Sequence, residues 1–207
     1  MSGGYWMGLM DSALTMPGTC VAADCVLSLD SVGSTNTYAA DLVRSGELYG
    51  DARRGGEIVV VCADAQTAGR GRLDHRWTSR PGESFTVSFV VNVPMPIVRD
   101  ASIGGWLQMI AGLAVLEAIR GACPHRSAEP QLKWPNDIVV GGRKLGGILA
   151  EMVPIPDCGE RVAVVFGVGL NLNVPVDRLP TENSISLQML ASDLPDPTPC
   201  GMNWPPE

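Results

Sequence analysis

The sequence is organised around Ile58-Val59-Val60-Val61-Cys62-Ala63, which continues through Asp64-Ala65 into Gln66-Thr67-Ala68-Gly69-Arg70-Gly71-Arg72. An apolar run of this length, rich in β-branched residues, predicts a buried strand with Cys62 as a small core side chain. In the second part, glycine lets a ligand approach the backbone, and arginine offers a rigid fork of donors for carboxylate or phosphate. The segment therefore suits an anionic ligand, and a solvated loop with ordinary basic residues is the open alternative.

A long polar connection is expected after this strand. The next strand candidate covers 84–91 and begins after Pro81-Gly82, so the connection also carries Arg76 and Arg80. Connections of this length in a compact domain are usually functional or disordered. Successive backbone N–H groups in such a turn can form an anion-binding nest, whereas the glycine spacing fits neither a Walker A motif nor a dinucleotide fingerprint. We therefore expect a flexible, anion-binding loop.

The composition is that of a globular domain with an acidic balance. Of 207 residues, 45% are hydrophobic and 18% charged, which predicts one domain. Fifteen basic against twenty-two acidic side chains give a net charge of −7, which argues against a general nucleic-acid or membrane-surface binder. Six cysteines and two histidines show no zinc-site spacing, and reduced thiols in the cytosol fit best. The pattern shows neither a secretory signal nor a membrane span.

Hydrophobic periodicity predicts the remaining elements. The expected strands cover 26–32 and 162–174, with a hairpin within 132–151 that turns at Gly141-Gly142. The expected helices cover 38–45, 100–120 and 184–191, the first capped by Ser34 or Thr35 and stopped by Gly46. The ends are expected to be a loose arm or short helix over residues 1–25, and an extended or disordered proline-rich tail over 192–207.

Polar groups outside the basic segment are candidate ligand contacts, each with a structural alternative. Ser34 and Thr35 lie where a strand feeds a helix N-terminus, a ready anion site, although capping alone explains them. Lys133 and Lys144 lie on the arms of the hairpin, where a lysine can hold a charge against phosphate or simply face solvent. The remaining alternatives are core packing for Trp134 and turn formation for Asn171 and Asn173.

Five motifs over roughly residues 26–190, taken in order, resemble the catalytic domain of biotin–protein ligases, also called biotin–[acetyl-CoA-carboxylase] ligases. The G-R-G-R segment followed by K-W-P-N-D is the most specific part of this likeness. The motifs are Ser34-Thr35-Asn36, Gln66 with Gly69-Arg70-Gly71-Arg72 and Trp77, Lys133-Trp134-Pro135-Asn136-Asp137, Arg143-Lys144-Leu145-Gly146-Gly147-Ile148-Leu149-Ala150-Glu151, and Gly167-Val168-Gly169-Leu170-Asn171.

The resemblance implies an α/β (α+β) fold of the class II synthetase-like biotin/lipoate ligase type, with a mixed β-sheet and helices packed on one side. Its catalytic domain would cover 26–191. The implied reaction has two steps: with Mg²⁺, biotin and ATP give biotinyl-5′-AMP and pyrophosphate. A lysine of a biotin carboxyl carrier protein domain, in acetyl-CoA or a related carboxylase, then takes the biotinyl group. A cytoplasmic location accompanies this activity.

The resemblance also implies three overlapping sets of site residues. The catalytic set is Arg70, Lys133 and Lys144. The biotin-binding set is Ser34, Thr35, Asn36, Gln66, Gly69, Arg70, Gly71, Arg72, Lys144 and Gly147. The nucleotide-binding set is Arg70, Arg72, Trp77, Lys133, Asn136 and Asn171, and no residue is assigned to a resident metal. A carboxylate approaching a triphosphate is an anion meeting an anion, so cations are needed there, and a closing loop would exclude water.

Two departures from the family pattern bear on function. Residues before 26 offer no room for a helix-turn-helix domain, so no DNA partner is expected. The family continues past Ser184-Ile185-Ser186-Leu187 with another helix and a small β-barrel, so a truncated chain and a minimal enzyme are both open. The rival functions are a lipoate-attaching enzyme, against which the G-R-G-R segment argues, and a non-catalytic biotin or biotinyl-adenylate binder. No pattern indicates the oligomeric state or the carboxylase.

Overall fold

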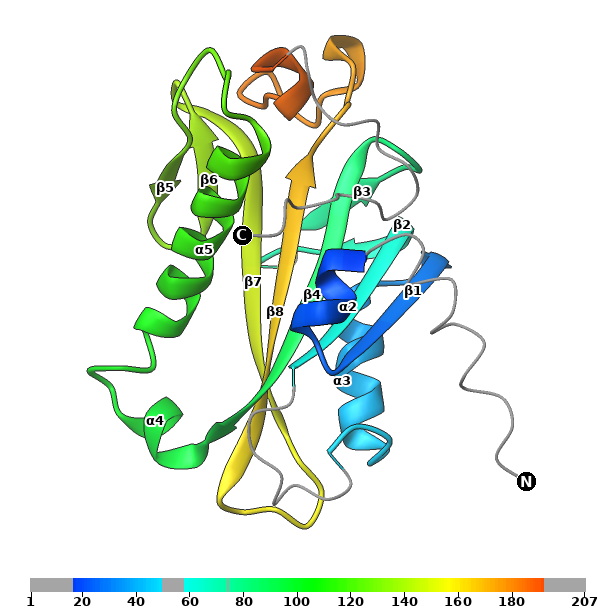
Figure 1. Ribbon diagram of the computed structural model, residues 1–207, viewed down its shortest axis with the longest axis vertical. Coiled ribbons are helices and arrows are strands. Elements are labelled where there is room, and N and C mark those ends of the chain that lie inside the picture. The colour runs from blue at the N-terminus through cyan, green and yellow to red at the C-terminus, as the bar shows by residue number, and fades with distance from the viewer. Residues whose placement is uncertain (1–16, 50–57, 74, 192–207) are drawn as a thin grey trace.

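The computed structural model describes residues 17–49, 58–73 and 75–191 (Figure 1). Residues 1–16, 50–57, 74 and 192–207 lie outside the described part, and with them most of the expected arm and the whole of the expected tail. The part of the arm that is described contains a short helix, α2 (Pro17–Ala22), one of the two forms expected for it.

An eight-stranded β-sheet forms the centre of the molecule. The main order is β1-β2-β4-β8-β7-β6-β5, and β3 pairs with β2 beside this path. β1 and β2 run parallel whereas the other pairs are antiparallel, so the prediction of a mixed sheet is confirmed. The strands are β1 (Cys25–Val32), β2 (Ile58–Arg70), β3 (Arg76–Ser79), β4 (Ser84–Pro94), β5 (Gln131–Lys133), β6 (Asp137–Val140), β7 (Arg143–Pro154) and β8 (Arg161–Asn171).

The hairpin expected within 132–151 is confirmed as β6 and β7. Gly141 and Gly142 form its two-residue turn with φ of +56° and +78°, and Val140 pairs with Arg143 across it. A tight hairpin turn needs positive φ at both central residues, which glycine adopts without strain. The chain therefore returns at once, and β7 runs on to pair with β8.

The helix predicted over 38–45 is α3 (Thr35–Arg44). Ser34 is its N-cap, with the side-chain oxygen accepting from the backbone N–H of Thr37 at 3.4 Å. Gly46 follows the C-cap with φ of +77°, as expected for a helix stop. The capping prediction for Ser34 is therefore confirmed.

The other two helix predictions need correction. The helix expected over 100–120 is α5 (Trp106–Ala122), preceded by the short α4 (Met95–Arg99). Asp100 starts a turn instead, because its carboxylate accepts from the N–H and hydroxyl of Ser102, hydrogen bonds that also lower the pKa of Asp100. The segment 184–191 forms only a 3-10 turn at Leu187–Met189, because its start lies extended beside Lys144. A second 3-10 turn covers Val176–Arg178.

Helices cover both faces of the sheet, not the single side expected. In Figure 1, α2 and α5 lie in front of the sheet and α3 lies behind it. On β8, Ala163 and Val165 belong to the core cluster that contains α3, whereas Val168 and Leu170 belong to the cluster that contains α5. Side chains alternate between the faces of a strand, so two apolar layers result. Within the described ranges, no helix combines the length and hydropathy of a membrane-spanning segment.

The expected flexible loop after residue 63 is mostly β-structure. β2 continues to residue 70, and β3 folds back on it so closely that a Cβ at Gly69 would overlap the carbonyl oxygen of Trp77. The N–H of Gly71 donates to the carbonyl of His75 at 2.7 Å, so it closes the turn and is not part of an anion nest. Hydrophobic periodicity missed this ribbon because its side chains are largely polar and exposed.

Cys25, at the start of β1, is expected to react slowly with alkylating reagents. Burial, followed by the neighbouring Cys20 and Asp24, raises the pKa of its thiol. A raised pKa leaves less thiolate at a given pH, and the thiolate is the nucleophile. Mass spectrometry after timed iodoacetamide treatment should show slower labelling of Cys25 in the folded protein than in urea. Equal rates would contradict the assignment.

Candidate active site

A cavity of about 280 Å³ opens on the face of the sheet that carries α3. On this face of β8, α3 packs over Ala163 and Val165. The next two residues of β8 on the same face are Gly167 and Gly169, which have no side chain and line the cavity beyond the N-terminus of α3. The lining residues are Ser34, Thr35, Asn36, Gln66, Arg70, Gly71, Arg72, Leu73, His75, Arg76, Trp77, Asn136, Asp137, Lys144, Gly147, Ile148, Leu149, Gly167, Val168 and Gly169.

One wall of the cavity is formed by uncharged polar groups at the start of α3. The backbone N–H of Thr35 donates to Gln66 Oε1 at 2.8 Å, and the Thr35 hydroxyl lies 3.1 Å from the same oxygen. Gln66 Nε2 has no hydrogen-bond partner among the residues that the structure describes. This wall therefore offers an amide donor to a neutral polar ligand group.

Arg70, at the end of β2, is held at the cavity by a carboxylate on β7, a strand separated from β2 by β4 and β8. Its Nη2 lies 3.1 Å from Oε1 of Glu151 on β7, and half of the arginine side chain remains exposed. Glu151 Oε2 also accepts from Asn36 Nδ2 at 2.8 Å. Asn36 is 3% exposed, and its Nδ2 further donates to the carbonyl of Leu149. The amide of Asn36 thus orients protein groups, and Asn36 also lines the cavity, so its contact with biotin stays a prediction.

Two more cations face the cavity from the hairpin side. Lys144 Nζ lies 2.7 Å from Asp137 Oδ1, with the lysine side chain 43% exposed. Arg72 Nη1 donates to Asn136 Oδ1 at 3.2 Å, and no carboxylate of the described residues pairs with Arg72. Arg72 therefore presents a full positive charge to a ligand, while Lys144 shares its charge with one neighbour.

Glycines on β8 make room for the cavity and for an aromatic wall. A Cβ at Gly169 would lie 2.6 Å from Trp77 Cε2, and a Cβ at Gly167 would overlap the side-chain amide of Asn36. The buried Nε1 of Trp77 has no partner in the described part of the chain. The face of the indole therefore packs against the backbone at Gly169, and the ring gives the cavity an apolar wall. Its Nε1–H donor is unused within the described ranges.

The structure brings most of the predicted site residues together, with three exceptions. Gly69 is buried beneath Trp77 and does not line the cavity. Lys133 is exposed on β5, the edge strand, and lies outside the lining. Asn171 is 2% exposed and donates to the carbonyl of Ile185 at 3.1 Å, so it faces the core. Trp134 is 77% exposed, so its core-packing alternative is wrong.

Sequence reasoning gave no role at the site to three groups that organise it: Ser88, Asp137 and Glu151, although two of the quoted motifs end in Asp137 and Glu151. Asp137 and Glu151 each pair with a cavity cation. Ser88 is fully buried on β4 behind α3. Each is a polar residue within or at the border of an apolar run, and buried polar groups need partners. That irregularity was the available signal.

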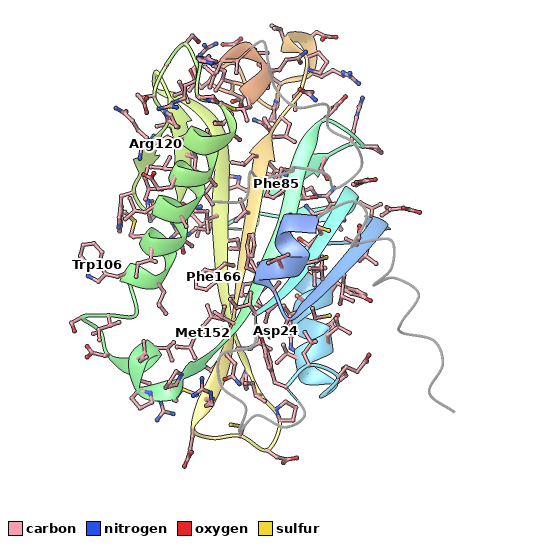
Figure 2. All side chains as sticks on the ribbon, in the orientation of Figure 1. Asp24, Phe85, Trp106, Arg120, Met152 and Phe166 are labelled. Carbon is pink, nitrogen blue, oxygen red and sulfur yellow. The ribbon has the colours of Figure 1, made fainter. Side chains whose placement is uncertain are left out.

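A second, larger cavity of about 540 Å³ lies between α5 and strands β4 and β8, on the opposite face. Figure 2 shows Phe85 and Phe166 beside this space, while Trp106 at the start of α5 points outward. All the residues that line it are apolar. It therefore lacks the donors that an anionic ligand needs, and the smaller cavity is the candidate active site.

Fold and cavity together define a class: an α/β domain whose cavity combines uncharged polar groups at a helix N-terminus with arginine and lysine side chains. The family profile described as "Biotin/lipoate A/B protein ligase family" matches residues 29–171. The chain belongs to this family.

Curated relatives and solved structures agree with this assignment. A biotin–[acetyl-CoA-carboxylase] ligase of Mycobacterium tuberculosis is 39% identical over 70% of this chain and 49% of its own length. A bifunctional ligase/repressor BirA of Bacillus spizizenii is 33% identical over 74% of this chain and 42% of its own. The chain thus spans less than half of these relatives.

The fold is shared with two solved ligases. The biotin protein ligase of Leishmania major in complex with biotinyl-5-AMP superposes with a TM-score of 0.60 at 24% identity, over 82% of this chain and 66% of that one. The biotin protein ligase of Aquifex aeolicus in complex with biotin and ATP superposes with a TM-score of 0.59 at 24% identity, over 84% of this chain and 63% of that one.

Proposed function

We propose that this chain is the catalytic domain of an ATP-dependent biotin–protein ligase that forms biotinyl-5′-AMP and transfers biotin to a lysine of a biotin carboxyl carrier domain. The observation that carries this is the convergence of Arg70, Arg72 and Lys144 on one cavity opposite the Thr35–Gln66 wall. The curated relatives are named biotin–[acetyl-CoA-carboxylase] ligase and ligase/repressor, which supports biotin over lipoate.

The chemistry requires two anions to meet. A carboxylate oxygen of biotin attacks the α-phosphorus of ATP, a carboxyl–phosphate bond forms, and the bond to the β-phosphate breaks with release of pyrophosphate. Positive groups fixed at that point stabilise the charge that builds up. The carrier lysine, as a free amine, then attacks the acyl carbon, AMP leaves, and the amine proton passes to solvent.

The charge pairs of the cavity fit this task. Arg70 and Lys144 have carboxylate partners, Glu151 and Asp137, which keep several cations close together without mutual repulsion. An arriving phosphate competes with Asp137 for Lys144 Nζ, and it can bind the Arg70 donors that Glu151 leaves free. Because Arg70 and Lys144 are already held at this point, little rearrangement is needed when negative charge develops on the phosphate.

Magnesium is assigned to ATP and not to a protein cage. In the described ranges, no cluster of three or more histidine, cysteine, aspartate or glutamate side chains could hold a metal ion. Mg²⁺ normally binds through substrate phosphates and one or two carboxylates. Asp137, whose side chain lines the cavity, is the carboxylate that could reach an ion carried in on the triphosphate, where the ion would neutralise phosphate charge. A cytoplasmic location, where biotin-dependent carboxylases and ATP are available, is part of this proposal.

The test is incubation of the chain with labelled biotin, ATP, Mg²⁺ and a carrier domain. Adenylate and labelled carrier are expected, and lipoate in excess should not compete. Arg70→Ala should lower adenylate formation by about a hundredfold, the scale for loss of one charge-stabilising donor.

Arg44→Ala is the matched control, because Arg44 also pairs with a carboxylate, Asp41, but lies on the outer surface of α3. It should leave adenylate formation unchanged. Biotin binding in calorimetry without any pyrophosphate release would favour the non-catalytic binder. Competition by lipoate would favour the lipoate-attaching enzyme.

A further inference from the structure

Ser88 contacts the site from behind without lining the cavity. It lies on β4, is 0% exposed, and its Oγ is 2.8 Å from Thr35 Oγ1 and 2.6 Å from Asn36 Oδ1. Thr35 belongs to the polar wall of the cavity, and Asn36 leads to the Arg70 side through Glu151. One buried hydroxyl thus joins the two halves of the site.

The direction of these hydrogen bonds follows from the groups at their ends. Asn36 Nδ2 faces the carbonyl of Leu149 and the carboxylate of Glu151, and both accept only. The amide oxygen of Asn36 must therefore face Ser88. A hydroxyl has one proton, so Ser88 donates it to Asn36 Oδ1. The Ser88 oxygen also contacts Thr35 Oγ1, whose single proton can go either to Ser88 or to Gln66 Oε1.

The chain of hydrogen bonds ends at a catalytic cation. Glu151 Oε2 accepts a hydrogen bond from Asn36 Nδ2, and Glu151 Oε1 forms an ion pair with Arg70 Nη2. The amide therefore fixes the carboxylate, and the carboxylate fixes the guanidinium. Without the Ser88 hydroxyl, the buried Asn36 oxygen loses its donor and the amide can rotate. Arg70, half of which is exposed, then loses the support that aims it into the cavity.

We propose that Ser88 is a positioning residue that, through Asn36 and Glu151, fixes the Arg70 guanidinium over the cavity and links it to the Thr35 wall. This rests on the proposed ligase function, in which Thr35 faces the biotin head and Arg70 faces the forming acyl phosphate. A ligand that fills the Thr35 side therefore meets Arg70 already in place.

Ser88→Ala tests the proposal, with Ser84→Ala as its matched control. Ser84 is also buried on β4, but its hydroxyl has no partner among the described residues. Ser88→Ala should lower the rate of pyrophosphate release at saturating biotin by about tenfold, the scale for an orphaned buried acceptor. The Kd for biotin should change by less than about threefold, since the wall keeps its Thr35–Gln66 contacts. Ser84→Ala should match the wild type.

A merely structural role for Ser88 gives a different pattern. It would lower the melting temperature and leave the rate below that temperature equal to the rate of Ser84→Ala, which would overturn the proposal. Combining Ser88→Ala with Arg70→Ala should cost little beyond Arg70→Ala alone, because the effect passes through Arg70. Additive losses would also overturn it. If Ser88→Ala does not fold, Ser88→Cys keeps a weaker donor and should give an intermediate rate.

A measurement without substrates separates this proposal from the function on which it rests. The Nη signals of Arg70, in NMR spectra of ligand-free protein labelled with ¹⁵N-arginine, should be resolved in the wild type and Ser84→Ala and broadened in Ser88→Ala. If the chain shows that result but forms no adenylate, the proposed ligase function would be refuted, whereas the positioning of Arg70 by Ser88 would be supported. Unchanged Arg70 signals, together with normal adenylate formation by Ser88→Ala, would refute the positioning alone.

Discussion

Lys144→Ala should lower biotinyl-adenylate formation by about 10²–10³-fold while weakening biotin binding much less, because a fixed charge matters most where phosphate charge develops. Lys144 Nζ lies 2.7 Å from Asp137 Oδ1 and is paired with it. Its charge therefore becomes fully available only when a phosphate displaces that carboxylate. Steady-state pyrophosphate release and isothermal titration with biotin measure the two effects separately.

Arg143→Ala is the control for Lys144→Ala. It removes a neighbouring cation from the same strand, and successive side chains of a strand point to opposite faces. Arg143 is exposed and does not line the cavity, so activity should be retained. Equal losses in adenylate formation and biotin affinity for Lys144→Ala would contradict this role, because they would show that the lysine binds the ground state and the transition state equally.

Gly146→Ala should lower the free energy of unfolding by about 3 kcal/mol, the upper range for overpacking of a well-packed core. Gly146 lies on β7 between Ile138 of β6 and Leu170 of β8. A Cβ there would overlap the carbonyl oxygen of Gly169 and reach 2.5 Å from Leu170 Cδ2. The backbone oxygen cannot move without disturbing the ladder, so the sheet must distort. Urea denaturation with an unchanged m-value measures the difference.

Gly121→Ala is the matched comparison for Gly146→Ala. Gly121 is exposed near the end of α5, and a Cβ there would meet no atom within 4 Å. Alanine restricts the unfolded chain and favours a helix, so a gain of about 0.5–1 kcal/mol is expected. A loss at Gly121 as large as that at Gly146 would mean that chain stiffness, and not overlap with the neighbouring strand, sets the cost.

The local sequence pattern was sufficient to predict the elements that are determined by residues close together in the chain. Continuous β-branched runs marked β2, β4 and β8, because a strand buried on both faces needs apolar residues throughout. Ser34 and Gly46 marked the ends of α3, and Gly141-Gly142 marked a turn. These features depend on backbone angles and caps, which neighbouring residues control directly.

Local pattern failed where a distant partner decided the outcome. The β2–β3 ribbon is stabilised by pairing and not by its own hydrophobicity, so it resembled a flexible loop. The extended start of 184–191 is set by its bridge to Lys144. Asn171 turned inward because Ile185 offers a carbonyl, and Lys133 stayed outside because β5 is the sheet edge.

The sequence by itself determined the family, the mixed sheet and the kinds of groups that line the cavity: arginine, lysine, hydroxyl and amide. The tertiary structure alone decided which of them share a cavity, which carboxylate balances which cation, and that Ser88 stands behind them. The reason is that charge pairing and buried hydrogen bonds act over a few ångströms of space. Thr35, Ser88 and Glu151 come within that range only when strands far apart in the chain lie side by side in one sheet.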